Sequence, residues 1–353
     1  MQSIAENRLD TLVLRGETAR LLGKLYYMAG RQTTGAGAYR DLYEELRQSV
    51  ITQGTRSSNG IEGIVVDEHR YLELMKNKVQ PSARNEKLIV GYRDTLDYIH
   101  SEHERIEVTP ETIKNLHLRI HAKTGDIAGQ FRQEDNVIER EEAGVRTIVY
   151  KPSPWRLVES QVTELCRQYN RLHGSPDTDE FLLMAGFILD FTCIHPFMDG
   201  NGRVSRLLTT LLAYKAGFEV VRYISHERLV DETRPAYYYA LTESSRNWQR
   251  GQHHWLPWLD YITHTFIEAH RELEARLAGA GQEKGYQSRR IREVITHELP
   301  TQFTIADILE KLPSASRPTI NRVLGQMREA KEIETGRAGP RAFYRKLSVL
   351  DRR

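Results

Sequence analysis

The feature that most constrains this chain is a polar run between two apolar segments. Phe181–Ile194 and Leu207–Ala216 are strongly apolar, and the first is hydrophobic on nearly all sides, which predicts a central buried helix. The run between them, His195 to Arg206, reads His-Pro-Phe-Met-Asp-Gly-Asn-Gly-Arg-Val-Ser-Arg. Core packing does not require a histidine, an acid, two glycines and two arginines together. We therefore interpret the run as a chemical site.

The second half of the run suits an anion. Gly200 and Gly202 flank Asn201, and glycine adopts φ > 0 at no steric cost, so successive backbone N–H groups can form a concave nest. A helix that starts near Gly202 would point its unpaired amides into the same nest. Arg203 and Arg206 are three residues apart, share a helix face and can bind further phosphate oxygens. The run thus predicts a phosphate site.

The first half of the run adds acid–base and metal chemistry. His195 can accept a proton near neutral pH, and Asp199 carries the oxygen ligand that Mg²⁺ prefers. Taken singly, such residues are most often a core histidine, a helix cap or part of a turn. A metal site shared by His195 and Asp199 is disfavoured, because Pro196 interrupts a continuous helix and no further His or Cys stands at ligand spacing. Together, the residues of the run favour a nucleoside-triphosphate site.

The run resembles the signature of Fic-domain proteins, His-x-Phe-x-(Asp/Glu)-Gly-Asn-Gly-Arg-x-x-Arg, and every specified position is present. Such proteins mostly transfer AMP from ATP to a hydroxyl side chain of a target protein, so the resemblance implies ATP and Mg²⁺. It implies that His195 is the base, that Phe197 anchors the loop and that Asp199 holds Mg²⁺. It also implies phosphate contacts for Gly200, Asn201, Gly202, Arg203 and Arg206. The Doc-type kinases depart from the second half of this motif, which favours nucleotidyl transfer here.

An upstream patch reads Ser-Ser-Asn-Gly-Ile-Glu-Gly. Its simple interpretation is a helix end, with Glu62 in solvent and Gly63 after the last turn. Ser58 and Glu62 are four residues apart and would point the same way on a helix. The patch resembles the inhibitory motif of Fic proteins, (Ser/Thr)-x-x-x-Glu-(Gly/Asn), which implies that Glu62 pairs with Arg206 and denies it to the γ-phosphate. Gly60 inside the helix costs about 1 kcal/mol relative to alanine, which suits a restraint that can be released.

A short β-hairpin is expected between the two motifs. Val137-Ile138 and Thr147–Tyr150 have strand character, with Glu139–Ala143 at the tip. An ordinary surface hairpin is one interpretation. In Fic proteins a hairpin at this place is the flap over the active site, where it aligns the target by strand addition.

Three adjacent tyrosines follow the signature. Part of Tyr237–Tyr239 is expected to face the core, and the resemblance implies that Tyr238 stacks on the base of the nucleotide. Some relatives have an asparagine about seven residues further on, where this chain has Ser245. Val220–Ile224, just after the signature helix, is expected to be a short extended run.

The C-terminal part has a separate pattern. Helices are expected over 288–298, 305–312 and 318–330, followed by a two-stranded wing over 331–335 and 341–345, which resembles a winged helix-turn-helix. Residues 287–353 hold 14 Lys and Arg against 8 Asp and Glu, a basic balance that fits DNA contact through residues 287–345. The start of the candidate recognition helix carries Arg317, Thr319, Asn321 and Arg322. Homodimerisation or docking of a protein target is the alternative role.

Composition sets the cellular context. A hydrophobic content of 39% suffices for globular cores, and no apolar run reaches the length of a membrane span. The first residues have no signal-peptide pattern. Cys166 and Cys193 lie in apolar helical patterns and are expected to be small core residues in a reducing cytoplasm.

We therefore predict a mainly α protein. It would have an N-terminal helical region with the inhibitory motif (1–104), a Fic-type helical core with a small β-hairpin flap (105–278) and a winged helix-turn-helix domain (287–353). The predicted reaction is transfer of AMP from ATP to a Tyr, Ser or Thr hydroxyl of a target protein, which could include the protein itself, with release of pyrophosphate. A de-AMPylating enzyme, in which Glu62 aligns water, and a DNA-binding regulator are the alternatives.

Overall fold

A computed structural model of the chain describes residues 2–5, 8–32, 40–142, 145–282, 286–312, 315–337 and 343–347. Contacts divide the chain into two units. The larger comprises residues 1–29 and 46–271, and the smaller comprises residues 30–45 and 272–353. The predicted site run belongs to the larger unit.

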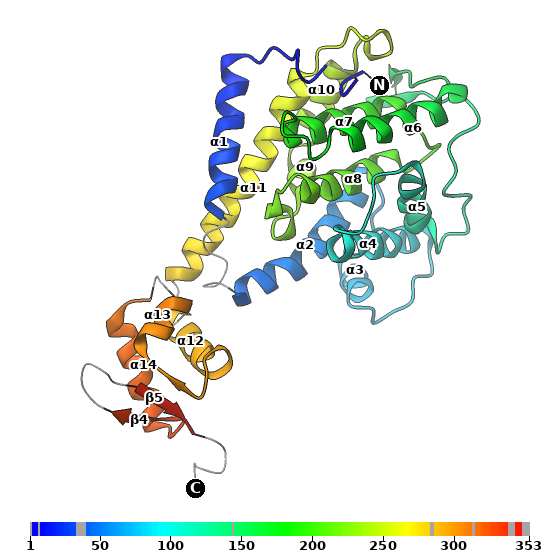
Figure 1. Cartoon of the computed structure of the whole chain (residues 1–353). Coiled ribbons are helices and arrows are strands. Elements are labelled where there is room, and N and C mark those ends of the chain that lie inside the picture. Colours follow the sequence, from blue (N-terminus) through cyan, green and yellow to red (C-terminus); the bar gives the residue numbers. More distant parts are fainter. Residues whose placement is uncertain are drawn as a thin grey trace. The chain divides into compact units, whose positions relative to one another are not determined.

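The larger unit is built around α7 (Glu180–Ile194), the predicted central helix. Asp179 caps it by accepting a hydrogen bond from the backbone N–H of Leu182 at 2.9 Å. Nearly all of its side chains are buried, as its hydrophobic sequence predicts. Helix α8 (Asn201–Lys215) packs directly against it, and Figure 1 shows the pair within the larger unit.

Further helices surround this pair. Helix α6 (Trp155–Leu172) packs on α7, while α4 (Arg84–Glu102) and α5 (Pro110–His121) cover α8. Thr109 caps α5, since its hydroxyl accepts from the N–H of Thr112 at 3.1 Å. The remaining helices are α1 (Gly16–Gln32), α2 (Arg40–Ile61), α3 (Glu68–Met75), α9 (His226–Glu232), α10 (Arg234–Ser245) and α11 (Leu256–Gln282).

An acid inside α7 fastens the N-terminal segment. Asp190 is fully buried, and its carboxylate accepts from the backbone N–H of Ser3 at 2.9 Å and from the Ser3 hydroxyl at 2.6 Å. The indole N–H of Trp248 donates to the same carboxylate at 2.6 Å. Ile4 is fully buried beside these bonds. Residues near the start of the chain are thus part of the core.

The expected hairpin is present. Strand β1 (Ile138–Glu142) pairs antiparallel with β2 (Val145–Tyr150), and a register shift occurs between Ile138 and Glu139. The prediction that residues 139–142 form the tip is wrong, because they continue strand β1. Ala143 and Gly144 lie outside the described residues.

The prediction of an extended run after α8, over Val220–Ile224, is also wrong. Residues Glu219–Arg222 form a 3₁₀ helix, η2. Val220 and Val221 are 1% and 2% exposed, so both face the core of a tight connection between α8 and α9. Two adjacent buried valines suggest a strand locally, but strand formation needs a neighbouring strand for its backbone hydrogen bonds, and η2 pairs with none among the described residues.

The smaller unit combines helices with a three-stranded antiparallel sheet. Its helices are α12 (Tyr286–Glu293), continued by a π-helical turn η4 (Val294–Glu298), α13 (Ile305–Lys311) and α14 (Arg317–Glu329). Its strands are β3 (Gln302–Phe303), β4 (Ile333–Arg337) and β5 (Phe343–Lys346), in the order β3-β5-β4. The third strand, β3, was not predicted, because two residues carry no periodicity. The winged-helix interpretation stays a prediction, and residues 338–342 lie outside the described part.

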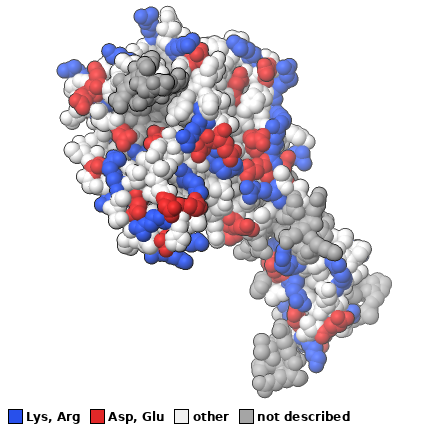
Figure 2. Space-filling view, turned by 180° about the vertical axis from the view of Figure 1, so that it is seen from behind, with Lys and Arg blue, Asp and Glu red and all other residues white. Residues whose placement is uncertain are grey.

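Two general properties of the chain follow. In the described parts of the chain, no helix is both long and apolar enough to cross a membrane. Cys166 and Cys193 are buried and are not joined in a disulfide, as expected. Figure 2 shows Lys and Arg interspersed with Asp and Glu over one face of the larger unit.

Candidate active site

The site begins where α7 ends. His195 follows Ile194 with φ of 53°, the left-handed conformation that is unfavourable for a residue with a side chain. Such a conformation costs about 1–3 kcal/mol and persists only where the surroundings enforce it. The backbone N–H of His195 still bonds the carbonyl of Phe191 at 3.0 Å, which ends the helix at this point. The imidazole therefore leaves the helix in a fixed direction.

Arg132 enforces this conformation from outside the motif. Its side chain is fully buried, and Nε donates to the carbonyl of His195 at 2.9 Å. The other guanidinium nitrogens donate to the carbonyls of Ile194, Ser153 and Glu134. Five donors in a planar fork match several carbonyls at once, which a lysine could not do. Arg132 thus holds the end of α7 in place.

The loop to α8 is fixed by Asn201 and Phe197. The Asn201 amide accepts from the backbone N–H of Phe197 at 2.8 Å and donates to its carbonyl at 2.7 Å. Phe197 is fully buried and stacks on His117 at 4.0 Å between ring centres. His117 Nδ1 accepts from the N–H of Gly129, so Nε2 carries the proton and donates to the carbonyl of Asp199 at 3.1 Å. Burial lowers the pKa of His117 to about 4, which keeps the ring neutral.

The start of α8 carries the residues of the predicted anion site. Gly200 adopts φ of 82° as the N-cap, and the helix begins at Asn201, slightly earlier than predicted. Arg203 is 1% exposed, and its Nη2 lies 3.2 Å from an oxygen of Asp199. Its Nε and Nη1 have no hydrogen-bond partner within the described residues. A buried guanidinium with unpaired donors next to a helix N-terminus is suited to an anionic ligand.

Asp199 lies at the rim of this anion site. Its side chain is 64% exposed, and Oδ1 accepts from the N–H of Gly200 at 2.6 Å. Over the described ranges, no group of three or more His, Cys, Asp or Glu could hold a metal ion. A single exposed carboxylate fits Mg²⁺, which commonly takes one or two carboxylates together with substrate phosphates.

Arg206 joins the two sequence motifs. It is 2% exposed, and its Nη2 donates to Glu62 Oε1 at 2.7 Å. Nε donates to the Ser58 hydroxyl at 2.8 Å, and Nη2 also donates to the Ser58 carbonyl at 2.9 Å. Ser58 and Glu62 therefore point the same way from the end of α2, and both meet Arg206.

The carboxylate of Glu62 lies directly over the first turn of α8, because a methyl group added at Gly202 would overlap it. Helix α2 ends at Ile61, and Gly63 follows with φ of 72°. The plain interpretation of a glycine-terminated helix thus also holds. Glu62 is 31% exposed and reaches back from this end to the anion site.

His195 is a neutral ring at ordinary pH. Burial lowers its pKa to about 4, while a hydrogen bond to the backbone of Thr192 and the charges of Glu62 and Asp199 oppose the decrease. A neutral imidazole has one nitrogen that can accept a proton. The site thus holds a base that needs no deprotonation before it acts.

A cavity of about 750 Å³ connects these elements. Its lining contains His195, Asn201, Gly202, Arg206 and Glu62, together with residues of the hairpin and of α10. Asp199 and Arg203 are not among the lining residues and pair with each other instead. The cavity is large enough for a nucleotide.

The tyrosines of α10 divide as expected. Tyr237 is buried, whereas Tyr238 is 40% exposed and lines the cavity beside Thr242 and Ser245. Tyr239 is exposed. Tyr238 is therefore placed where a planar ligand could stack on it.

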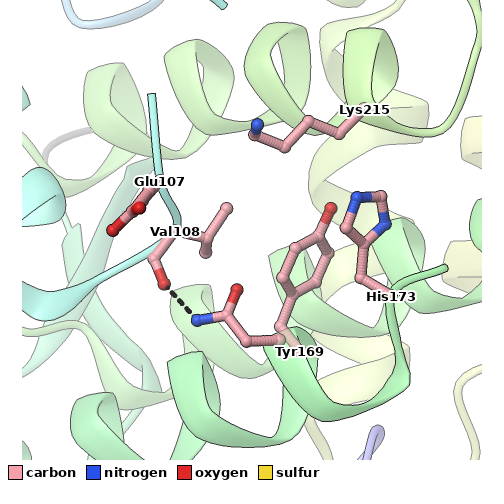
Figure 3. A pocket seen from close by; sticks show the side chains of 6 residues that line it. Glu107, Val108, Tyr169, His173 and Lys215 are labelled. Atoms are coloured by element: carbon pink, nitrogen blue, oxygen red, sulfur yellow. Dashed lines mark hydrogen bonds between the residues drawn. The ribbon is translucent and has the colours of Figure 1, made fainter. Parts of the chain in front are cut away.

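A second hollow, of about 310 Å³, contains none of the predicted site residues. Figure 3 shows Lys215 and Tyr169 pointing into it from two helices, with Glu107 on the opposite side. Its lining has no anion nest, so it does not compete as the nucleotide site.

Sequence reasoning missed Arg132 and His117. Both bind backbone carbonyls. Every residue type has a backbone carbonyl, so the sequence of the partner residue gives no sign of such a bond. A lone arginine after Gly-Gln-Phe carried no local signal of its role.

Comparisons with known proteins match the part of the chain that holds these residues. A family model described as the Fic/DOC family matches residues 107–213. A Fido domain-containing protein of Dictyostelium discoideum is 33% identical over 90 residues, and the match spans 26% of this chain but only 57% of that protein.

Solved structures share the fold. A Fic family protein from Desulfovibrio desulfuricans superposes with a TM-score of 0.63 at 18% identity, over 96% of this chain and 98% of that one. A Fic domain-containing signaling protein from Bacteroides thetaiotaomicron gives 0.57 at 17% identity, over 75% and 98%. Fic-1 from C. elegans gives 0.58 at 19% identity, over 75% and 74%.

The matched range contains the whole run from His195 to Arg206, which forms the loop and anion site described above. Members of this family generally transfer a nucleoside monophosphate to proteins. Residues 107–213 thus match the Fic/DOC family, and the chain shares the fold of solved Fic-family structures.

Proposed function

We propose that this protein transfers AMP from ATP to a Tyr, Ser or Thr hydroxyl of a target protein, and that Glu62 restrains the reaction through Arg206. The observation that carries the proposal is the juxtaposition at the start of α8. A buried arginine with unpaired donors, Arg203, lies beside the helix amides, and a neutral base, His195, lines the same cavity as Arg206.

The residues support an in-line displacement. The target hydroxyl attacks the α-phosphorus, and a new O–P bond forms as the bond to the bridging oxygen breaks. Pyrophosphate leaves with that electron pair, and His195 takes the hydroxyl proton. The amides at the start of α8, with Arg203 and Arg206, stabilise charge on the phosphate oxygens.

Asp199 would hold Mg²⁺, because its exposed carboxylate lies at the rim of the phosphate site. Bound there, Mg²⁺ would neutralise charge on the phosphates. Arg203 contacts the same carboxylate and would orient it. Tyr238 would stack on the base at the other end of the cavity.

Glu62 competes directly with the nucleotide. Its Oε1 accepts a hydrogen bond from Nη2 of Arg206 and lies over Gly202, where a phosphate would approach the amides of α8. A γ-phosphate therefore cannot bind Arg206 until Glu62 leaves. The proposed restraint is this competition of two anions for one cation.

The test uses ATP labelled at the α-phosphate. We expect Glu62→Gly protein to label itself or added target proteins, and expect the label to vanish when His195→Ala is added. ATP labelled at the γ-phosphate should give no label, because pyrophosphate leaves. Label that persists without His195, or that comes from the γ-phosphate, would overturn the proposal.

A second function, DNA binding, is favoured by one observation. Arg317, Asn321 and Arg322 are exposed on the first turns of α14, as a recognition helix requires. Mobility shifts of duplex DNA at increasing salt test it. Binding that weakens with salt and is lost in Arg317→Ala would support this function, and no shift at low salt would exclude it.

A further inference from the structure

The end of α2 also rests on a buried carboxylate that belongs to neither sequence motif. Glu227, in the first turn of α9, is 1% exposed. Three hydroxyls surround it, with Ser225 Oγ 2.9 Å from Oε2, and Thr210 Oγ1 and Tyr92 Oη 3.3 Å and 3.4 Å from Oε1. In each of these bonds the hydroxyl donates and a carboxyl oxygen of Glu227 accepts.

Tyr92 links Glu227 to the inhibitory segment. Its side chain on α4 is fully buried, and its hydroxyl interacts with the Ser58 side chain and donates to Glu227 at 3.4 Å. Ser58 Oγ accepts from Arg206 Nε at 2.8 Å. A guanidinium only donates, so the relay runs in one direction, from Arg206 through Ser58 and Tyr92 to Glu227.

Helix α2 lies unusually close to this carboxylate. A Cβ at Gly54, one turn before Ser58, would lie 2.9 Å from Glu227 Oε2 and 2.9 Å from Leu96 Cδ2. Only glycine permits this approach without a shift of either neighbour. The end of α2 therefore contacts the core at two points. Gly54 lies against Glu227, and Glu62, just after the helix, bonds Arg206.

The charges are consistent with this arrangement. Burial raises the pKa of Glu227, and hydrogen bonds from Ser225 and Thr210 and the charge of Arg206 offset only part of this rise. Arg206 thus interacts with two acids, one bound directly and one through the relay.

We propose that Glu227 is a positioning residue of the restraint. Through Tyr92 it orients the Ser58 hydroxyl as an acceptor, and it so holds the end of α2 against Arg206. This inference rests on the proposed function, because it concerns the state in which Glu62 occupies Arg206.

Tyr92→Phe tests the relay, because it removes the central hydroxyl and keeps the ring. We expect AMP transfer to rise about 5-fold, as the loss of one neutral hydrogen bond implies. Amide hydrogen exchange over residues 54–62 should accelerate, while exchange over α7 stays unchanged. In the Glu62→Gly background the same substitution should add nothing, because the restraint is already absent.

Tyr169→Phe is the matched control. Tyr169 is an equally buried tyrosine of the larger unit, and it has no part in the relay. Glu227→Gln keeps the volume and one acceptor oxygen, and we expect it to raise transfer and exchange in the same direction as Tyr92→Phe.

The outcomes separate the two proposals. If Glu62→Gly is active but Tyr92→Phe leaves both transfer and exchange at wild-type values, the relay is wrong and the proposed function stands. If Glu62→Gly transfers no AMP, the proposed function is wrong, and the exchange of residues 54–62 alone decides whether the relay holds α2.

Discussion

Replacing Glu62 by glycine gives the sharpest test of the restraint. The pair joins Arg206, which is 2% exposed, to a carboxylate 31% exposed at 2.7 Å. A charge-assisted hydrogen bond in such a partly buried position contributes about 2–3 kcal/mol. Its loss leaves the two bonds to Ser58, so Arg206 stays in place and becomes available to a phosphate. Each 1.4 kcal/mol is about tenfold in rate, so we expect transfer to rise about 30- to 150-fold.

The assay measures initial rates of label transfer at saturating ATP. Glu68→Gly is the matched control, because Glu68 pairs with Arg56 on the exposed side of the same helix end. It should leave the rate within about twofold, as expected for a surface ion pair. Glu62→Gln keeps the bulk over Gly202 without the charge, and we expect an intermediate rate.

Two results would refute the reasoning. Equal rates for wild type and Glu62→Gly would show that Arg206 is not withheld by Glu62. An equal increase in Glu68→Gly would show that loosening of α2, rather than the loss of the ion pair, is responsible.

Three further outcomes follow from the site. In Glu62→Gly protein, kcat/KM should stay level from about pH 8 to about pH 5. It should fall only as the pH drops through the His195 pKa, which is about 4 in the unchanged chain and lower once the charge of Glu62 is removed; a fall centred near 6.5 would contradict a buried ring. Arg132→Met should destabilise folding by about 3 kcal/mol or more in urea unfolding, because it strips donors from buried carbonyls, and a loss below about 1 kcal/mol would contradict the clamp. Tyr238→Ala should raise the KM for ATP by about 5- to 100-fold with kcat little changed, and an unchanged KM would exclude stacking.

Much of the site could be predicted because its chemistry is local. The residues from His195 to Arg206 are adjacent in sequence. The conformational freedom of the glycines and the charge of the arginines indicate a phosphate site without knowledge of the fold. The juxtaposition of Glu62 with Arg206 spans 144 residues and was expected from the family resemblance alone. No periodicity or spacing within the chain indicated that contact.

The parts that could not be predicted depend on distant partners. Arg132 and Glu227 look like ordinary charged residues in sequence, and only the fold buries them against carbonyls or hydroxyls. Val220 and Val221 illustrate the opposite error, because a local preference for strand was overridden by packing between two helices. The central helix α7 was predicted well, since its apolar sequence leaves no alternative to burial.

The attachment of Ser3 to Asp190 has a consequence for synthesis. The two residues are 187 positions apart. A ribosome adds roughly 5–20 residues per second, so about 10–40 s pass between them. During that time Ile4 has no core to enter, and Asp190 receives its bond from Trp248 later still. Ser3 and Ile4 are therefore synthesised early but are among the last residues to reach their native positions.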